Sequence, residues 1–241
     1  MVSYRTHADN IHMTTLHLIS SMATQPLLAA LIPFYQSQHP GVQVHVESAG
    51  GVDVAKRVQA GEVFDGVVLA SNAIDKLIDS GHVVAGSRAD LVRSDVAVAV
   101  PAGQPIPDIS TEAALKAAVL AASTLGYSTG PSGTQLLKQF EKWGIADQVA
   151  SKLVQAQPGI PVGALVAQGK VALGFQQRSE MQGVEGITLM GGMPPGTEII
   201  TVFSGSVASA CQQAQAMQDV LAFWQSPACD DLKRQHGMQP A

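Results

Sequence analysis

The sequence predicts an α/β fold with two lobes, and three observations support this prediction. Short apolar runs typical of strands alternate with amphipathic helical segments along most of the chain. Successive strand–helix units are typical of a mostly parallel sheet covered on both faces. Similar units occur in both halves, and Val96–Val100 and Ile199–Phe203 lie where the chain could cross between lobes. We therefore expect two lobes joined by two crossings, with the site in the cleft between them.

Composition limits the classes of function. The chain has 241 residues, of which 46% are hydrophobic and 14% are charged, as expected of a globular protein. The net charge of −5 leaves no basic surface for nucleic acid. No apolar run approaches the roughly 20 residues that cross a bilayer, so we expect no membrane insertion.

The N-terminal stretch Met1–His12 is polar and lacks the apolar segment of a secretory leader. We expect it to be an extension outside the lobes and the protein to be cytoplasmic. If a leader was trimmed from the native protein, the expected location becomes the periplasm.

The first half predicts three strand–helix units. The strands are expected at residues 16–19, 42–46 and 64–69. The first helix runs from about residue 24 to 38, the second from the glycine pair Gly50-Gly51 to Gly61, and the third from Ser71 to about residue 80. Ser20 and Ser21 end the first strand and are suited to capping the helix that follows.

The second half predicts similar units after the first crossing strand. Helices are expected at residues 111–121, from Thr129–Gly133 to Gly144, and from Val162 to Gly169, with strands at 125–128 and 171–175. A glycine- and proline-rich break at 191–196 precedes the second crossing strand, and the chain is helical from residue 212.

Small polar residues gather at five helix starts, and these carry the functional signal. Helix N-termini present free N–H groups and a positive dipole end, which suit an anion. Each start could also be no more than a capped helix, but five in two lobes favour an anion cleft. The candidates are Ser20, Ser21, Gly50, Gly51 and Ser71 in the first lobe, and Ser132, Gly133 and Val162 in the second.

Several catalytic and cofactor motifs do not occur. The seven histidines are scattered without metal-ligand spacing, and no Gly-x-Ser-x-Gly or Gly-x-Gly-x-x-Gly motif follows a strand. The run from Gly163 to Lys170 is one residue too long for a phosphate loop, and Val171 stands where Ser or Thr is required. We expect neither a metal nor a cofactor.

The chain resembles the molybdate-binding-type (type 2) solute-binding proteins from Thr15 onward. The similar segments, in the family's order, are Leu18–Met22, Gly50-Gly51, Ala55–Gly61, Phe64–Val67, Tyr127–Gly133, Val166–Gly169, Ser226-Pro227 and Gly237–Pro240. The resemblance implies a periplasmic-binding-protein-like fold with two hinge strands and an anion held by helix N-termini. It adds Ser128 to the ligand candidates. The implied lobes are residues 13–97 with 203–241, and residues 98–202, after an extension of residues 1–12.

Two departures from the family concern the ligand. Gly51 stands where the family usually has a hydroxyl side chain. Gln177 stands before Arg178-Ser179-Glu180, where the family usually has a tyrosine before Arg-Ser-Asp. Two neutral hydroxyl donors are thus lost, which disfavours molybdate itself. Gln177 and Arg178 remain candidates for ligand binding.

The aconitate isomerase branch, which resembles these binding proteins, offers an alternative chemistry. Moving a proton across an allylic system in a tricarboxylate needs clamped carboxylates and one positioned base. Arg57, Arg93 and Arg178 are candidate clamps, although a solvated surface charge is the more common role for an arginine. Glu47 and Glu180 are the candidate bases, because each lies near the carboxyl end of a strand.

Two functions therefore remain open. The first is an isomerase of this branch acting on a di- or tricarboxylate. The alternative is a substrate-binding protein of an ABC transporter or a sensor for molybdate-like oxyanions or organic acids. A small anionic ligand is the expected partner under both, and a transporter only under the alternative.

Overall fold

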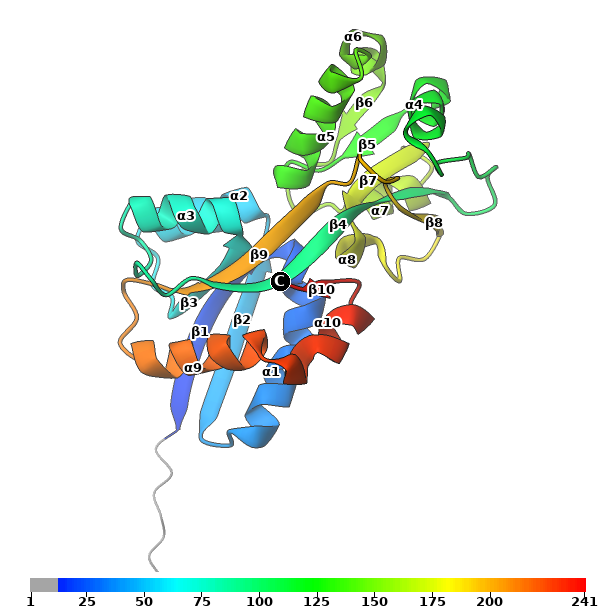
Figure 1. The fold of residues 1–241 in the computed structure, drawn as a ribbon. Helices are drawn as coiled ribbons and strands as arrows, with labels where there is room; N and C mark the ends of the chain where they lie inside the picture. Colours follow the sequence, from blue (N-terminus) through cyan, green and yellow to red (C-terminus); the bar gives the residue numbers. More distant parts are fainter. Residues whose placement is uncertain (1–12) are drawn as a thin grey trace, which may run out of the picture.

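The computed structural model describes residues 13–241 as two α/β lobes joined by two long strands (Figure 1). The predicted extension, residues 1–12, lies outside the described residues. The strands follow the order β2-β1-β3-β9-β4-β7-β5-β6, with β8 and β10 also pairing with β4. None of the helices within residues 13–241 is both long and apolar enough to span a bilayer.

Lobe 1 is built on three parallel strands, β1 (Thr14–Ser21), β2 (Val42–Ala49) and β3 (Gly66–Ala70). One face packs against α1 (Gln25–Gln38) and α9 (Ala214–Gln225). The other face packs against α2 (Gly51–Gln59) and α3 (Ser71–Asp79). The three predicted strand–helix units are therefore confirmed, with the sheet covered on both faces.

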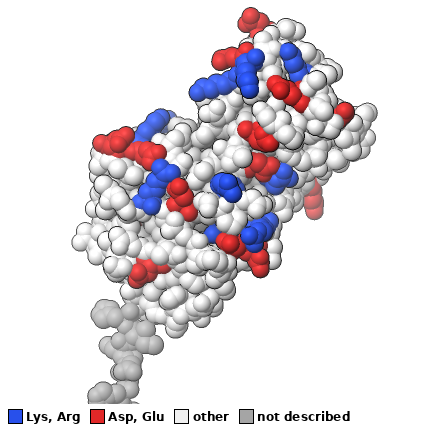
Figure 2. All heavy atoms as spheres, viewed as in Figure 1, with Lys and Arg blue, Asp and Glu red and all other residues white. Residues whose placement is uncertain are grey.

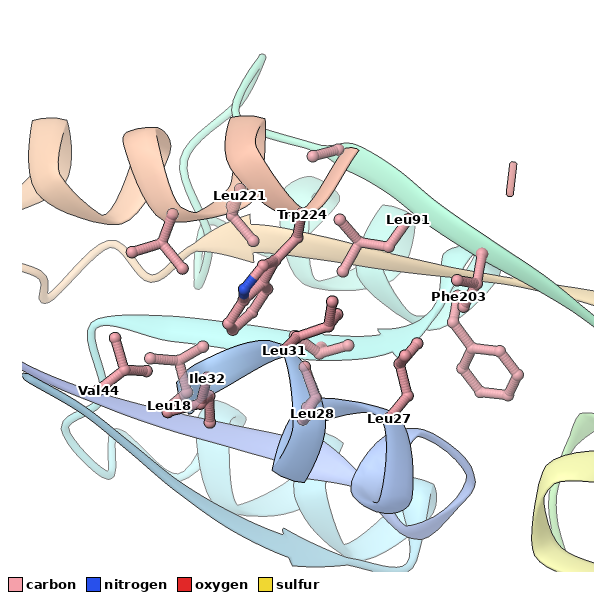
Figure 3. Packing of buried hydrophobic residues seen from close by; sticks show 14 of the residues in the cluster. Leu18, Leu27, Leu28, Leu31, Ile32, Val44, Leu91, Phe203, Leu221 and Trp224 are labelled. Carbon is pink, nitrogen blue, oxygen red and sulfur yellow. The ribbon is translucent and has the colours of Figure 1, made fainter. Parts of the chain in front are cut away.

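The larger core of lobe 1 is centred on Trp224, which is fully buried. Its indole lies between α9 and α1, close to Leu31 and Leu221 (Figure 3). Because such a ring buries a large apolar area, this packing fixes the helical layer behind the sheet.

Lobe 2 contains the parallel strands β5 (Leu125–Tyr127), β6 (Leu153–Gln155) and β7 (Leu173–Gln177), with β8 (Ile187–Gly192) beside β4. Its helices are α4 (Glu112–Ala121), α5 (Pro131–Lys142), α6 (Ala146–Val149), α7 (Val162–Ala167) and α8 (Arg178–Met181). Thr111 caps α4, because its hydroxyl accepts a hydrogen bond from Ala114 N–H at 3.1 Å.

The two hinge strands are β4 (Ala89–Pro101) and β9 (Ile200–Val207). The first part of β4, up to Asp95, pairs with β9, and from Val96 onward β4 pairs with β7 and β8. Both strands therefore run from one lobe into the other, as Figure 1 shows. Two crossing strands were expected, and both are longer than their apolar runs suggest.

Short helices and strands fill the connections, and some of them were not expected from the sequence. The 3-10 helices η1 (Met22–Thr24), η2 (Ala150–Lys152) and η3 (Pro227–Cys229), helix α10 (Asp230–Gln235) and strand β10 (Gln239–Pro240) fill the connections. The sequence did not predict β6, β8 or α6. The expected cap is also corrected: Ser21 precedes η1, and its side chain forms no cap hydrogen bond.

Candidate functional site

In lobe 1, the helix starts that follow β1, β2 and β3 share one edge of the sheet. A Cβ atom built on Gly51 would lie 3.8 Å from the Cβ of Ser21 and 3.7 Å from Leu69 Cδ2. Ser71 begins α3 directly after β3. The structure therefore brings Ser21, Gly51 and the end of β3 together, as expected when parallel strands end at a common edge.

Ser20 is fully buried and belongs to a hydroxyl pair. Its Oγ lies 2.7 Å from the Oγ of Ser48, the residue directly opposite it in the parallel register of β1 and β2. Sequence reasoning missed Ser48, although the alignment of the two strand ends could have indicated it.

In lobe 2, the start of α5 requires a glycine. A Cβ atom on Gly133 would lie 1.9 Å from the carbonyl oxygen of Ser128, so no side chain fits there. The Oγ atoms of Ser128 and Ser132 are 3.0 Å apart, and Ser132 is buried. The close approach of the backbone holds these two hydroxyl groups beside the first turn of α5.

The Val162 N–H group is already occupied. It donates to Gln176 Oε1 at 2.7 Å, and the N–H group of Gly163 donates to the same oxygen at 3.4 Å. In this structure the first turn of α7 therefore binds a buried glutamine of its own lobe rather than presenting Val162 to an anion.

Glu180 lies at the other end of this hydrogen-bond chain. The Nε2 of Gln176 donates to Glu180 Oε1 at 2.9 Å. Burial disfavours the charged carboxylate and raises the pKa of Glu180 to about 7, an effect that the hydrogen bond from Gln176 partly opposes. A carboxyl group with such a pKa is suited to taking and returning a proton near neutral pH.

Gln177 points to the opposite side of β7, into the hinge. Its Nε2 donates to Thr201 Oγ1 on β9 at 2.7 Å. Within residues 13–241, neither Gln177 Oε1 nor the buried Ser94 Oγ of β4 has a hydrogen-bond partner. A layer of buried polar groups thus lies where the hinge strands pair, and no local sequence pattern marks Ser94 or Thr201 as part of it.

Arg178 is paired within the protein. Its Nε and Nη2 donate to the two carboxylate oxygens of Asp95 at 2.8 and 2.6 Å. This bidentate pair fixes the start of α8 to β4 and neutralises the guanidinium charge. Arg178 would have to exchange Asp95 for a ligand carboxylate before it could act as a clamp.

Glu47 lies apart from the helix starts of lobe 1. Its carboxylate accepts hydrogen bonds from Arg57 at 2.9 and 3.1 Å, and Arg57 also binds Glu62. Since Arg57 is six residues after Gly51, it lies about 9 Å along α2 from the helix start. Glu47 and Glu62 instead line an open hollow of about 340 Å³ on lobe 1, together with His17 and His45.

The remaining candidate clamp, Arg93, is exposed on β4. Its Nε donates to the Pro240 carbonyl at 3.2 Å, on the pairing of β4 with β10. Among residues 13–241, no three His, Cys, Asp or Glu side chains gather where they could hold a metal ion.

Helix α8 also touches lobe 1. The hydroxyl of Ser179 donates to the Ala23 carbonyl of η1 at 2.9 Å, and both residues are buried. Glu180 is the next residue, so its element lies where the two lobes meet.

Two comparisons with known proteins indicate related families. The family model of bacterial extracellular solute-binding proteins matches residues 16–239. An aconitate isomerase from Pseudomonas sp is 32% identical over 233 residues, which cover 95% of this chain and 88% of that protein.

Solved structures share the fold at lower identity. The periplasmic molybdate-binding protein of Azotobacter vinelandii matches with a TM-score of 0.76 at 18% identity, covering 92% of this chain and 98% of that one. A sulfate-binding protein of Mycobacterium tuberculosis matches with a TM-score of 0.76 at 18% identity, covering 95% and 87%. With its two lobes, its two hinge strands and these matches, the chain belongs to the family of bacterial extracellular solute-binding proteins.

Proposed function

We propose that this protein is an isomerase of the aconitate isomerase type, which moves a proton across an allylic system in a di- or tricarboxylate. The observation that carries the proposal is Glu180, a carboxyl group on the helix that contacts lobe 1 through Ser179, whose pKa is raised to about 7. The relative that is 32% identical over 95% of the chain supports the same reaction class.

In the proposed reaction, Glu180 acts as both base and acid. Its carboxylate removes a proton from the saturated carbon next to a substrate carboxylate, and the electron pair of that C–H bond delocalises over the allylic carbons. The protonated Glu180 then returns the proton to the far carbon, so the double bond moves and the glutamate is regenerated. Buried hydrogen-bond donors around the substrate carboxylates would stabilise the intermediate charge.

The substrate carboxylates are proposed to bind at the helix starts. Ser21 and Gly51 would serve one lobe, and Ser128, Ser132 and Gly133 the other, with Gln177 and Arg178 at the hinge. The lobes are taken as residues 13–97 with 203–241, and residues 98–202. Gly51 has no side chain, and a Cβ atom there would make only ordinary contacts with Leu69 and Ser21, which supports a ligand bulkier than a tetrahedral oxyanion at this position.

Of the two candidate bases, the geometry favours Glu180. Glu47 is exposed and held by the positively charged Arg57. Glu180 is partly buried, its carboxyl group is largely desolvated, and it has no cationic partner in the described part of the chain. The Glu47 carboxylate is therefore already engaged by a cation, whereas the Glu180 carboxyl group is not.

A second candidate function is capture of an oxyanion or organic acid for a transporter or sensor. It is favoured by the structural likeness to molybdate- and sulfate-binding proteins and by the retained hydroxyl groups of Ser21 and Ser132. A transporter component of this type works outside the inner membrane, so secretion of the native protein would favour it.

The test is to mix purified protein with cis- or trans-aconitate in heavy water and to follow both isomers by NMR. Turnover with incorporation of solvent deuterium is expected, and Glu180→Gln should lower kcat by at least about 100-fold. Glu185→Gln is the matched control, since Glu185 is exposed and only five residues away.

Two results would contradict the proposal. The first is the absence of turnover together with a large thermal shift from molybdate, tungstate or sulfate, which would favour the binding protein. The second is turnover that survives Glu180→Gln but is lost in Glu47→Gln, which would assign the base to lobe 1.

A further inference from the structure

Gln176 has a fixed amide orientation, because its two ends face different kinds of group. Its Oε1 lies 2.7 Å from the Val162 nitrogen and 3.4 Å from the Gly163 nitrogen, and both are backbone donors. Only the oxygen of the amide can accept these bonds, so the nitrogen must face Glu180. The side chain is 3% exposed, and solvent therefore does not compete for either end.

This orientation distinguishes the two oxygens of the Glu180 carboxylate. Oε1 accepts from Gln176 Nε2 at 2.9 Å. An amide N–H group cannot take up the proton of a carboxyl group, so the hydrogen-bonded oxygen is held in its acceptor state. The other oxygen is the one left to exchange a proton with a bound molecule.

Within the described residues, the elements packed against α8 carry no unpaired charged side chain that could compete with Gln176 for Glu180. Helix α8 packs against β4, β7, η1 and α7, and the last three carry no titratable side chain. The charged groups on β4 are engaged elsewhere: Asp90 with Arg88, Arg93 with the Pro240 carbonyl, and Asp95 with Arg178. The other titratable group nearby in the chain is His236, whose neighbours Gln235 and Gly237 contact Gln182 and Arg178.

We infer that Gln176 is a positioning residue for Glu180, joining the first turn of α7 to one carboxylate oxygen so that the other exchanges the proton with the substrate. The inference rests on the proposed isomerase function for its catalytic part. It also assigns the N–H groups of Val162 and Gly163 to holding this side chain in place rather than to binding an anion.

The first measurement needs no substrate. The side-chain carboxyl carbons of the glutamates are labelled with ¹³C, and the Glu180 signal is identified by its loss in Glu180→Gln. In the wild type, Glu180 should titrate near pH 7. In Gln176→Met its pKa should rise by about one unit, because a hydrogen bond to the charged form is removed.

A second variant controls for the case in which Gln176→Met misfolds. Gln176→Glu keeps an acceptor for the Val162 and Gly163 N–H groups but replaces the donor by a like charge, so the pKa of Glu180 should rise at least as far. Gln168→Met is the matched control, because Gln168 is exposed at the other end of α7. It should leave the titration unchanged.

The second measurement is the pH profile of aconitate interconversion. In both Gln176 variants the acid limb of kcat/KM should move to higher pH, and kcat at pH 7 should fall roughly fivefold or more with little change in KM. A wild-type enzyme that turns over while the Gln176 variants keep its titration and pH profile would overturn the inference. A wild type without turnover would overturn the proposed function, and the ¹³C titration would still show whether Gln176 holds Glu180.

Discussion

Gly51 is the residue whose replacement most directly separates the two candidate functions. It is the first residue of α2, its φ is not positive, and a Cβ there meets only ordinary contacts with Ser21 and Leu69. A side chain can therefore be added without strain. Gly51 stands where the family usually has a hydroxyl side chain, and the structure has space for the Cβ of such a side chain.

We expect Gly51→Ser to place a second hydroxyl beside Ser21 and so to improve the site for a tetrahedral oxyanion. One added hydrogen bond to an anion should raise molybdate affinity by about tenfold, while aconitate turnover falls because the added atoms occupy its space. Calorimetry and the NMR assay measure the two effects. Gly51→Ala is the control that adds the Cβ without the hydroxyl, and equal molybdate affinity in both variants would contradict the idea.

Gly133 carries a different constraint, since a Cβ there would overlap the Ser128 carbonyl. Gly133→Ala should lower the free energy of unfolding by about 1–3 kcal/mol, because the backbone at the start of α5 must move. It should also weaken ligand binding, since the Ser128–Ser132 pair moves with it. Urea unfolding compares it with Gly130→Ala, where the nearest atom is 3.8 Å away and little change is expected.

At the scale of elements, α8 joins several parts of the molecule within four residues. Arg178 binds Asp95 of β4, Ser179 binds Ala23 of η1, and Glu180 binds Gln176 of β7. The stability of this segment therefore depends on groups from both lobes. Its ionisation also has a signature that can be measured without any ligand.

Glu180 should make the protein less stable as the pH rises. The folded state keeps the proton on Glu180 up to about pH 7, whereas the unfolded chain releases it near the ordinary pKa of 4.5. Between these values the folded state binds one more proton, so the free energy of unfolding decreases with pH, by roughly 1–3 kcal/mol in total.

Urea unfolding between pH 4.5 and 8 tests this expectation. Glu180→Gln should lack that part of the slope, and Glu185→Gln should retain it. A wild-type slope in Glu180→Gln would mean that Glu180 ionises alike in both states.

Elements with regular patterns could be predicted from the sequence, and elements defined by long-range pairing could not. The three units of lobe 1 follow from their apolar periodicity and glycine stops. By contrast, β8 is half-buried along its whole length and pairs with β4, so its sequence has no continuous apolar run. The first half of β4 contains Arg93 and Asp95, and these charged residues interrupt the apolar run from which the start of the strand would be predicted.

The residues of the candidate site also fall into those that could be predicted from the sequence and those that could not. Ser21, Gly51 and Gly133 are marked locally by strand ends and helix starts. Ser48 and Gln176 depend on which strands and helices become neighbours in space, and a single sequence does not contain that information.

At the scale of the whole molecule, charge and shape limit how a ligand can arrive. Lysines and arginines are interspersed with aspartates and glutamates on the face in Figure 2, without a continuous basic stripe. With a net charge of −5, the protein does not attract a polyanion as a whole. Under the proposed function, local donors at the helix starts and closure of one lobe on the other would therefore have to supply the affinity.

The Ser179–Ala23 hydrogen bond is the point at which lobe coupling can be tested. Ser179→Ala leaves the buried Ala23 carbonyl without this donor, so the free energy of unfolding should fall by about 1–2 kcal/mol. With one interlobe bond lost, the ligand-free lobes should separate further about β4 and β9. Ligand binding should then weaken severalfold, because the ligand must restore the closed arrangement.

Small-angle X-ray scattering measures this coupling directly. The radius of gyration of ligand-free Ser179→Ala should exceed that of the wild type, and saturating trans-aconitate should bring the two values together. Ser209→Ala is the matched control, because its hydroxyl donates to the Gly81 carbonyl at 2.8 Å entirely within lobe 1. If Ser179→Ala and Ser209→Ala gave the same radius and the same affinity, α8 would only stabilise lobe 2, and closure would depend on the two hinge strands alone.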